Sequence, residues 1–519
     1  MKLIVTLLVL CVVDNVRGIK YVNQTLPPDL TQLSDYRLKS RNPDIWTTIA
    51  GEPIDIRNII SINSDVFSNQ LNIDTNLNFD AERIPERVVH AKGTVAIGYF
   101  EVTNDVSKYT SADVFNSIGK ITPLIVRFSS STPSLGGPDA MNDLKGMAVK
   151  FYTKDGNLDL LCLQTPVYPY TDPLFFNSFI HAFKKNPKTN FFDSTARWDL
   201  ATLRPTVLNV ILWVAADYGI PNGYRKMDGF PIHTYELSNK QGETHYVRFN
   251  FRTEQGLDNL TVAQAVDING RDVDYYNRDL YRAIARKDYP VWRLEMDVLT
   301  KEDLRQVGYN PFDVTRLWKN GTYSTVQIGR LVLNENPDNM FRVSELSAFN
   351  PGHLVPGIPG PVDFLFKGRR INYRDTQNYR LGRNHNKIPI NLPRFAKTYV
   401  RDGKPPVRDN MGDAPNYFPN SFNGPIPYVD ETRPRHKLLV LESNAVDLEP
   451  MSYFYNYVLT NDAQRQRLID NLSVFLASVS SPVLERSLNL LALVDKDLGT
   501  RVAQGLKALL IARTTDTAT

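Results

Sequence analysis

A histidine and an arginine stand close together in the segment "IPERVVHAKG", which spans residues 84–93. His90 follows two valines on a stretch whose neighbours read as a β-strand, and Arg87 lies three residues earlier. A neutral imidazole accepts a proton and a charged one donates it, so His90 could act as a general acid and base. A single strand histidine is also commonly a hydrogen-bonded residue of a core. These residues alone leave both interpretations open.

Other common catalytic patterns do not occur in the chain. Its seven histidines include no H-x-x-x-H or H-E-x-x-H pair, so local spacing indicates no zinc site. The sequence also has no glycine-rich phosphate loop and no G-x-S-x-G segment. The chemistry of His90 must therefore be judged together with the elements that would position it.

The composition is that of a globular chain with little net charge. Of 519 residues, 42% are apolar and 22% are charged, and the formal net charge is +4. So small an excess creates no field that would attract nucleic acid or a membrane surface. We expect neither of them as a partner.

The first eighteen residues, "MKLIVTLLVLCVVDNVRG", have the layout of a secretory signal, with Lys2, a short apolar run and a small residue, Gly18. The run is too short to span a bilayer, and no later stretch is long and apolar enough to do so. We therefore expect a secreted, extracellular protein that begins near Ile19. Cys11 would leave with the signal, and Cys162 would remain, buried as a small apolar group or paired with another chain.

Four N-x-[ST] triplets are potential glycosylation sites of an exported chain. Because such triplets also arise by chance, they add little to the prediction of export. Their asparagines are Asn23, Asn259, Asn320 and Asn471.

The order of patterns divides the chain into several parts. After the signal at residues 1–18, residues 19–80 are polar and contain prolines, which indicates an N-terminal arm with little core of its own. Within residues 81–391, short β-branched or aromatic runs such as "TVAIGYFEV", "PLIVRFSS" and "HYVRFNFRT" are separated by turn signals. They predict a large antiparallel sheet that closes into a β-barrel with helical interruptions, so the fold class is α+β.

Two further parts follow the predicted barrel. Residues 392–440 are rich in Pro, Asn and Arg without periodicity, which indicates an extended wrapping segment, and residues 441–519 form a C-terminal helical domain. In that domain Asn461 and Gln464 predict a capping box, and Ser481 with Pro482 predicts the start of a further helix. The apolar face of the first of these helices consists of Leu468, Leu472, Phe475 and Val479.

The segment around His90, "NFDAERIPERVVHAKGTVAIGYFEVT", is followed in order by "TPLIVRFS", "GMAVKFYTKDGNLDLL" and "DPLFFNSFIHAFKKNP". Further along come "NPFDVTRLW", "GRLVLNENP", "GRRINYRDTQNYRLGRN" and "APNYFPNSF". Together these segments resemble the haem catalase family from about residue 40 to about residue 425. Several motifs in the same order make the resemblance far more specific than any one of them.

The resemblance implies haem b inside the barrel, with a tyrosinate as the proximal iron ligand. By position that ligand is Tyr373, and Arg369 stands four residues before it. On a helix, which the family implies for this segment, both side chains share a face. The guanidinium would then favour the phenolate, which is the form that binds ferric iron.

On the other side of the haem, His90 matches the distal histidine of the family. It would take a proton from the peroxide oxygen that binds iron and return it to the leaving oxygen. Ser129 matches the serine that hydrogen-bonds the other ring nitrogen. By the same resemblance, the haem propionates would be held by bidentate pairing with arginines, and apolar side chains would wall the pocket. These residues are Arg87, Arg127 and Arg380 for the propionates, Val89 and Phe176 for the wall, and Asp143 for a channel carboxylate.

The sequence departs from the family on the distal side. Leu163 stands where the family has a catalytic asparagine, and Gln164 replaces a second one. Leucine has no hydrogen-bond donor, and the loss of one preorganised donor costs on the order of 10²-fold or more in rate. Strand alternation argues against Gln164 reaching into the site. Tyr168 and Pro169 also stand where the family has paired phenylalanines.

The resemblance also bears on partners. The family usually forms intertwined tetramers, so a homotetramer is expected. Some members bind NADPH, but Asn209 and Tyr218 replace a histidine and an arginine of that site, and Asn320 replaces another histidine. We therefore expect no tight nicotinamide binding.

Three functions are compatible with these residues. The leading one is secreted, haem-dependent dismutation of hydrogen peroxide by a catalase that protects against oxidants. The second is a haem peroxidase or hydroperoxide-processing enzyme whose catalase activity is weak because of Leu163. The third is a non-enzymatic secreted haem-binding protein. His90, Arg369 and Tyr373 argue against the third, because a carrier does not need a distal acid–base group.

Overall fold

The computed structural model describes residues 26–40, 42–59, 69–407, 410–431 and 447–516. They belong to two compact units, one within residues 1–80 and one within residues 81–519. The predicted signal and the triplet at Asn23 lie outside the described residues. The N-terminal part contains α2 (Pro28–Lys39), α3 (Ile56–Ile59) and α4 (Gln70–Ala81), and neither α2 nor α4 contributes a buried residue.

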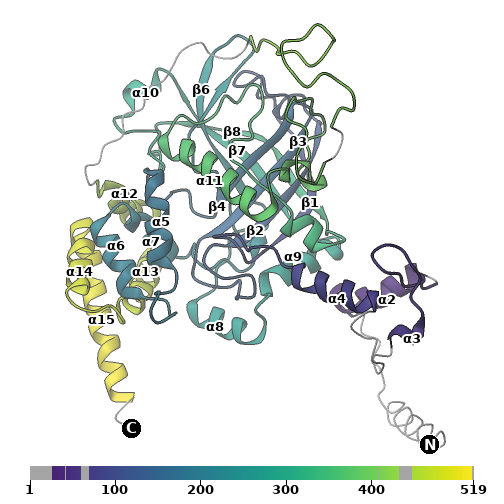
Figure 1. Cartoon of the computed structure of the whole chain (residues 1–519). Helices are drawn as coiled ribbons and strands as arrows, with labels where there is room; N and C mark the ends of the chain where they lie inside the picture. Colours follow the sequence, from purple (N-terminus) through teal and green to yellow (C-terminus); the bar gives the residue numbers. More distant parts are fainter. Residues whose placement is uncertain (1–25, 41, 60–68, 408–409, 432–446, 517–519) are drawn as a thin grey trace, which may run out of the picture. The chain divides into compact units, whose positions relative to one another are not determined.

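An eight-stranded antiparallel sheet lies at the centre of the second unit (Figure 1). Its order, β4-β3-β2-β1-β8-β7-β6-β5, consists of two four-stranded meanders that join where β1 pairs with β8. The first meander contains β1 (Gly93–Val102), β2 (Ile121–Ser130), β3 (Lys145–Thr153) and β4 (Gly156–Leu163). The second contains β5 (Tyr235–Ser238), β6 (Thr244–Thr253), β7 (Val291–Thr300) and β8 (Ser324–Glu335).

The two outer strands, β4 and β5, are not neighbours in the sheet order. Instead, the short segment at residues 229–230 bridges the gap, because Phe230 pairs with Leu163 at the end of β4 and Gly229 pairs with Phe251 of β6. The predicted α+β class with a large antiparallel barrel is therefore confirmed. Its closure depends on two isolated bridges and not on a continuous ladder.

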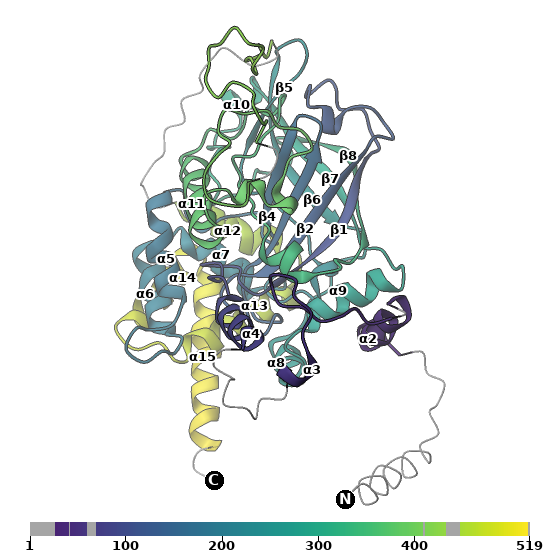
Figure 2. The ribbon, with the colours of Figure 1, turned by 45° about the vertical axis from the view of Figure 1, so that its right-hand side comes forward.

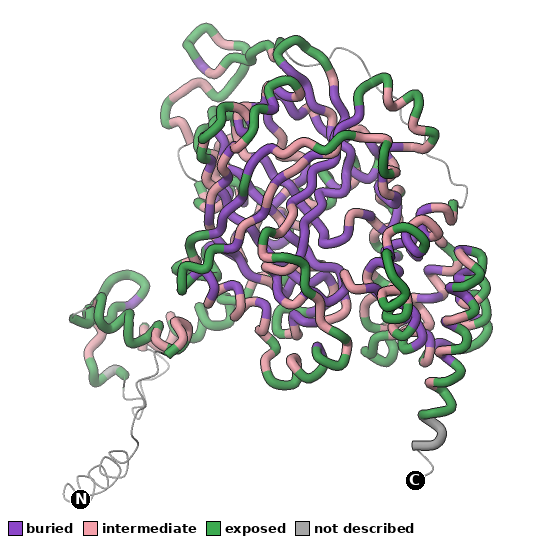
Figure 3. Tube along the Cα trace, turned by 180° about the vertical axis from the view of Figure 1, so that it is seen from behind, coloured by how far each residue is buried: buried purple, intermediate pink, exposed green. Residues whose placement is uncertain are grey.

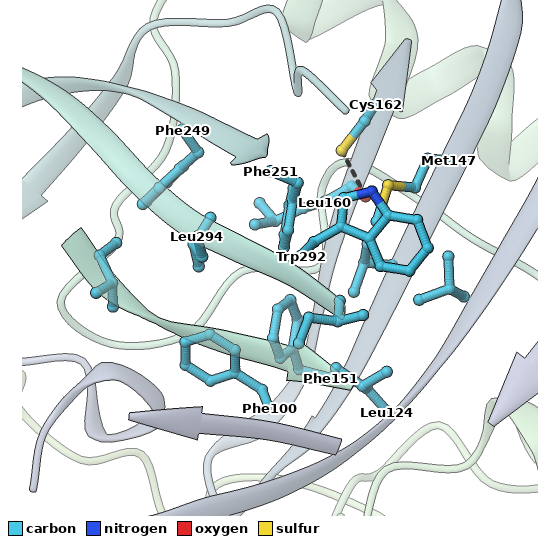
Figure 4. Close-up of a cluster of buried hydrophobic side chains, with 14 of the residues drawn as sticks. Phe100, Leu124, Met147, Phe151, Leu160, Cys162, Phe249, Phe251, Trp292 and Leu294 are labelled. Carbon is cyan, nitrogen blue, oxygen red and sulfur yellow. Dashed lines mark hydrogen bonds between the residues drawn. The ribbon is translucent and has the colours of Figure 1, made fainter. Parts of the chain in front are cut away.

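Alternate strand residues pack into one hydrophobic core inside the curved sheet (Figure 4). Phe100, Phe151 and Trp292 are fully buried there. Cys162 points into the same core, and its thiol contacts the carbonyl oxygen of Leu160 at 3.7 Å. Burial raises the pKa of the Cys162 thiol well above its ordinary value, so this cysteine serves as a small packing residue.

A second core forms where helices from the middle of the chain meet helices from its end (Figures 1 and 3). The first group is α5 (Phe176–Phe183), α6 (Ser194–Leu203) and α7 (Val207–Ala215). The second is α12 (Glu449–Tyr453), α13 (Asp462–Leu476), α14 (Val483–Val494) and α15 (Lys496–Asp516). Leu468 and Leu472 are buried on α13, on the face that the sequence predicts.

The starts of two helices, α13 and α14, differ in detail from those that the sequence predicts. The side chain of Asn461 caps α13 by accepting from Gln464 N, but Gln464 Oε1 accepts from the backbone of Thr460, so the capping box is only half formed. Helix α14 begins at Val483, with Pro482 as the cap residue in place of Ser481. The Ser481 hydroxyl instead hydrogen-bonds the Glu485 carboxylate at 2.8 Å.

Helix α11 (Phe364–Leu381) lies outside the sheet, in front of its strands in Figure 1 and to the left of them in Figure 2. Asp363 caps it by accepting from Phe366 N, and it ends at Gly382, whose φ of +88° suits glycine. The described residues of 392–431 contain neither helix nor strand. The remaining α-helices with described bounds are α8 (Val262–Arg271), α9 (Tyr275–Ala285) and α10 (Asp303–Gln306).

Candidate active site

One cavity lies between the barrel and α11, and its volume with its open mouth is about 1120 Å³. Of the predicted site residues, Arg380 does not line this cavity. It lies seven positions beyond Tyr373 on α11. The predicted residues that do line the cavity are Arg87, Val89, His90, Arg127, Ser129, Phe176, Arg369 and Tyr373.

His90 lies in a loop just before β1, so the prediction of a strand at this histidine is wrong. Its φ is +61°, in the left-handed region that residues other than glycine rarely adopt. Hydrogen bonds fix this backbone, because His90 N donates to Ser131 O at 3.0 Å and His90 O accepts from Arg127 Nη1 at 2.8 Å. Arg87 precedes the same loop, and Arg127 lies on β2.

The imidazole of His90 faces the cavity and lies against Ser129, with Nδ1 3.0 Å from the serine Oγ. Gly146, on β3, makes this close approach possible. A Cβ at that position would lie 2.7 Å from Ser129 Oγ and 3.0 Å from His90 Nδ1. Burial, and then the nearby cations Arg127 and Arg369, lower the pKa of His90 to about 3, so the resting ring is neutral and can accept a proton.

Three buried arginines gather at one end of the site. Burial lowers the pKa of Arg87 well below its ordinary value, and the charges of Arg127 and Arg380 lower it further. The carboxylate of Glu345 lies 3.6 Å from Arg87 Nη1, and its negative charge raises the pKa of all three arginines against the effect of burial. Within the described part of the chain, nothing accepts a hydrogen bond from Arg87 Nη1, Arg127 Nε or Arg380 Nε. Three arginines against one carboxylate leave an excess of buried positive charge, which is costly, so this cluster suits a ligand that carries two carboxylates, as haem does.

Arg369 and Tyr373 lie one turn apart on α11, as the spacing predicts, and Arg369 Nη2 is 3.4 Å from the phenol oxygen. The other terminal nitrogen, Nη1, lies 2.7 Å from His233 Nε2, and His233 Nδ1 lies 3.0 Å from Asp363 Oδ2. Because a guanidinium only donates, His233 Nε2 must accept, and Nδ1–H must donate to Asp363. Burial lowers the pKa of His233, which agrees with a neutral ring.

The guanidinium of Arg369 also lies over the Tyr168 ring, 5.7 Å from its centroid. Burial alone would lower the pKa of Arg369, but the phenol groups of Tyr373 and Tyr168 raise it above its ordinary value. Arg369 therefore keeps its charge. Tyr168 also contacts the hydroxyl of Tyr170 at 3.4 Å, so phenols occupy part of the cavity wall.

Leu163 lines the same cavity from the end of β4, opposite Gly146 on β3. Gln164 cannot take its place. Its Oε1 accepts from Lys145 N at 2.6 Å and its Nε2 donates to Asp143 O at 2.9 Å, away from the site. The prediction from strand alternation is thus confirmed, and Leu163 contributes only an apolar surface. The Asp143 side chain lies on a neighbouring cavity and accepts from Thr132.

The positions named for nicotinamide binding are divided between two places. Tyr218 and Asn320 line a separate cavity of about 870 Å³ with its opening, whereas Asn209 is buried on α7 and donates to Thr315 O at 2.6 Å. Both arginines of that cavity are engaged. Arg252 pairs with Asp228 at 2.9 Å, and Arg248 donates to three backbone carbonyl groups.

The geometry agrees with what comparison with known proteins shows. The family model described as catalase matches residues 48–424, which is more than half of the chain. The chain belongs to the catalase family. A second model, described as a catalase-related immune-responsive domain, matches residues 453–506.

Catalases from distant organisms are similar to this chain over most of its length. The catalase of Glandirana rugosa is 41% identical over 474 residues, which cover 89% of this chain and 90% of that protein. The catalase of Methanosarcina barkeri is 43% identical over 443 residues, or 84% and 88% of the two chains. The solved structure of catalase A from Saccharomyces cerevisiae has a TM-score of 0.84 at 33% identity and covers 89% of this chain and 99% of that one.

Membership of the catalase family makes this chain an oxidoreductase that acts on hydrogen peroxide and depends on haem. No helix among the described residues is both long and apolar enough to cross a membrane. Sequence reasoning did not find His233, Asp363 or Gly146. Only Asp363 carried a local signal, as an N-cap residue directly before α11.

Proposed function

We propose that this protein is a secreted haem b enzyme that converts hydrogen peroxide to oxygen and water. Haem would lie in the cavity beside α11, with Tyr373 as the iron ligand on one side and His90 facing the other. One observation carries the proposal. A single cavity is lined both by a neutral imidazole and by a tyrosine next to a charged guanidinium.

The arginine cluster supports the porphyrin part of the proposal. Arg87, Arg127 and Arg380 supply three buried positive charges against the single carboxylate of Glu345. The two propionates of haem would balance this excess, with the guanidinium groups of Arg87 and Arg127, which line the cavity, as donors. Val89 and Phe176 would form apolar walls around the ring.

Bound haem supplies an iron that exchanges two electrons with peroxide. His90 would accept the proton from the peroxide oxygen that becomes bound and deliver it to the departing oxygen, which leaves as water. Its lowered pKa keeps the ring in the accepting form, and Ser129 holds the ring orientation through Nδ1. The two residues thus perform proton transfer and positioning, respectively.

On the opposite side, Arg369 would compensate the negative charge of a Tyr373 phenolate. Asp363 and His233 keep the guanidinium in place, since His233 accepts from Arg369 and donates to Asp363. The cation needs no proton exchange during turnover. This side of the site therefore serves to hold the ligand and its charge.

A second function, a haem peroxidase or hydroperoxide-processing enzyme with weak catalase activity, is favoured by the distal wall. Leu163 offers no hydrogen bond to peroxide, and Tyr168 replaces an apolar ring with an oxidisable phenol. The third function, a non-enzymatic haem carrier, does not account for the hydrogen-bonded pair of His90 and Ser129.

The proposal extends to location and partners. We infer export from the signal-like residues 1–18, and a homotetramer from the family. Tight NADPH binding is not expected, because Arg248 and Arg252 are already engaged and Asp228 and Asp297 add negative charge to the lining of that cavity. Nucleic acid and membranes are not expected as partners of a chain whose net charge is +4.

The direct test of cofactor binding is an absorption spectrum of the purified protein before and after addition of hemin. We expect a Soret band at one haem per chain, unchanged by washing. A protein that stays colourless after hemin is offered would refute the haem proposal. The secretion proposal has its own test, which is recovery of the protein from the medium of cells that express the full chain.

A further inference from the structure

Two of the three N-x-[ST] triplets among the described residues have constrained asparagines. Asn471 lies on α13, is half-buried, and donates from Nδ2 to Ala215 O at 2.6 Å. A sugar on that nitrogen would replace this contact and separate α13 from the end of α7. Asn259 is also half-buried, and its backbone pairs with Pro221.

Asn320 has a different environment. It is exposed in the turn that precedes β8, next to Gly321, whose φ of +84° and open surroundings fit a tight surface turn. Its Oδ1 accepts from the Tyr323 hydroxyl at 3.2 Å. Among the described residues nothing accepts a hydrogen bond from Asn320 Nδ2, the atom that carries an N-linked glycan.

The same asparagine lines the separate cavity of about 870 Å³. Its neighbours in that lining include Trp318 and Tyr323, and the Tyr323 hydroxyl is the group that orients the Asn320 amide. Because Asn320 is exposed while Trp318 is buried, the asparagine lies at the outer edge of this cavity. A glycan attached there would begin at the cavity mouth.

We propose that Asn320 carries an N-linked glycan that covers the mouth of this cavity. In the attachment, the amide Nδ2 loses one proton and forms a bond to the first sugar, supplied by a lipid-linked oligosaccharide diphosphate, and the lipid diphosphate leaves. The inference rests on the proposed export, because only a chain that enters the secretory pathway meets this donor. The glycan and the engaged arginines together close the cavity to large anionic ligands.

The first experiment maps glycans on protein secreted by a eukaryotic host. The protein is treated with a peptide-N-glycosidase in ¹⁸O water, and the peptides around Asn259, Asn320 and Asn471 are compared by mass spectrometry. We expect the conversion to labelled aspartate at Asn320 and none at Asn471. Asn320→Gln should remove one glycan's mass, whereas Thr322→Ser, which keeps the triplet and the hydroxyl, should retain it.

A variant with a different secretory signal tests the glycosylation site independently of the proposed export. An established secretory signal replaces residues 1–18, so the chain enters the pathway whether or not its own leader works. Glycan at Asn320 in this form, with no secretion of the natural chain, would contradict export by the native leader and support the site. Secreted protein whose Asn320 is unmodified in both forms overturns the inference.

Coverage of the cavity has a separate readout. Oxidative footprinting by hydroxyl radicals is compared between the glycosylated protein and the same protein trimmed by an endoglycosidase to its first sugar. We expect the labelling of Tyr323 to rise at least about twofold on trimming, while Tyr289, a partly exposed tyrosine before β7, stays constant. Equal labelling of Tyr323 in both samples would show that the glycan does not cover the mouth.

Discussion

The two sides of the candidate haem cavity differ in how complete their hydrogen bonding is. On the side of α11, Asp363, His233, Arg369 and Tyr373 form a continuous hydrogen-bonded chain. On the side of His90, the imidazole contacts its serine partner, Ser129, but Leu163 contributes no donor. Under the proposed function, retention of haem and activation of peroxide depend on different residues, and Leu163 lies on the side that activates peroxide.

The change with the widest consequences is expected on the side that holds the cofactor, because every haem-dependent activity requires bound haem. Tyr373→Phe removes the proposed iron ligand, so the haem content should fall at least about tenfold, because even outer-shell changes weaken metal binding about 10–100-fold. The measurement is the ratio of Soret to protein absorbance. Tyr379→Phe, an exposed tyrosine on the same helix, should leave that ratio unchanged. Full haem content in Tyr373→Phe would show that this tyrosine is not the iron ligand.

His90→Gln tests the opposite side. We expect a loss of about 10²–10⁴-fold in the rate of peroxide consumption, the usual contribution of a general acid–base, with haem content retained. The exposed His181, on α5, provides the control His181→Gln, whose rate should match the wild type. A His90→Gln enzyme with wild-type kcat/KM would assign the proton transfer to another group.

Leu163→Asn restores an amide donor and should increase the rate of oxygen release by up to about 10²-fold. Leu163→Met, which keeps the surface apolar, should stay near the wild-type rate. Oxygen release is followed with an electrode at equal haem concentration. If Leu163→Asn releases oxygen no faster than Leu163→Met, the missing hydrogen-bond donor does not limit the rate of oxygen release.

Gly146→Ala tests how closely the distal pair is packed. The added Cβ would lie 2.7 Å from Ser129 Oγ, so the pair must shift, at a cost of about 1–3 kcal/mol in the free energy of unfolding. Denaturant unfolding measures this cost, and the peroxide rate should fall as well. Gly136→Ala, where nothing lies within 4 Å of the added Cβ, is the matched control. Equal stability of both variants would mean that the contact is not tight.

The smallest effect concerns pH. With the pKa of His90 lowered to about 3, kcat/KM should stay flat from about pH 8 to about pH 5 and not fall near 6.5. The unfolded chain, whose histidine titrates near about 6.5, binds the proton first, so the stability should decline as pH falls from about 6.5 toward about 3. His90→Gln should make this decline less steep. An activity loss centred near pH 6.5 would contradict the conclusion that the His90 ring is buried and neutral in this range.

The sequence predicted which residues line one cavity better than it predicted their local geometry. His90 was expected in a strand because two valines precede it, yet hydrogen bonds to Ser131 and Arg127 hold it in a left-handed loop. Those contacts join residues about forty positions apart, which no local pattern reveals. Gly146 was missed for the same reason, since its role appears only when β3 is placed beside His90.

The proximal network shows the same limit. The four-residue spacing of Arg369 and Tyr373 correctly predicted that both side chains lie on one face of a helix, because this arrangement depends only on nearby sequence. His233 comes from a distant loop, 136 residues before Arg369, and nothing in its own segment indicates a partner. The barrel was predicted from alternating strands, but its closure through Gly229 and Phe230 depends on two isolated bridges.

The most direct test of the central claim is the oxygen yield of the haem-loaded, purified protein, measured as oxygen released per hydrogen peroxide consumed. If haem lies between Tyr373 and His90 and this chain is a catalase, one molecule of oxygen should appear for every two of peroxide, without an added organic donor. Peroxide that disappears only when an organic donor is present, with no oxygen released, would contradict that claim.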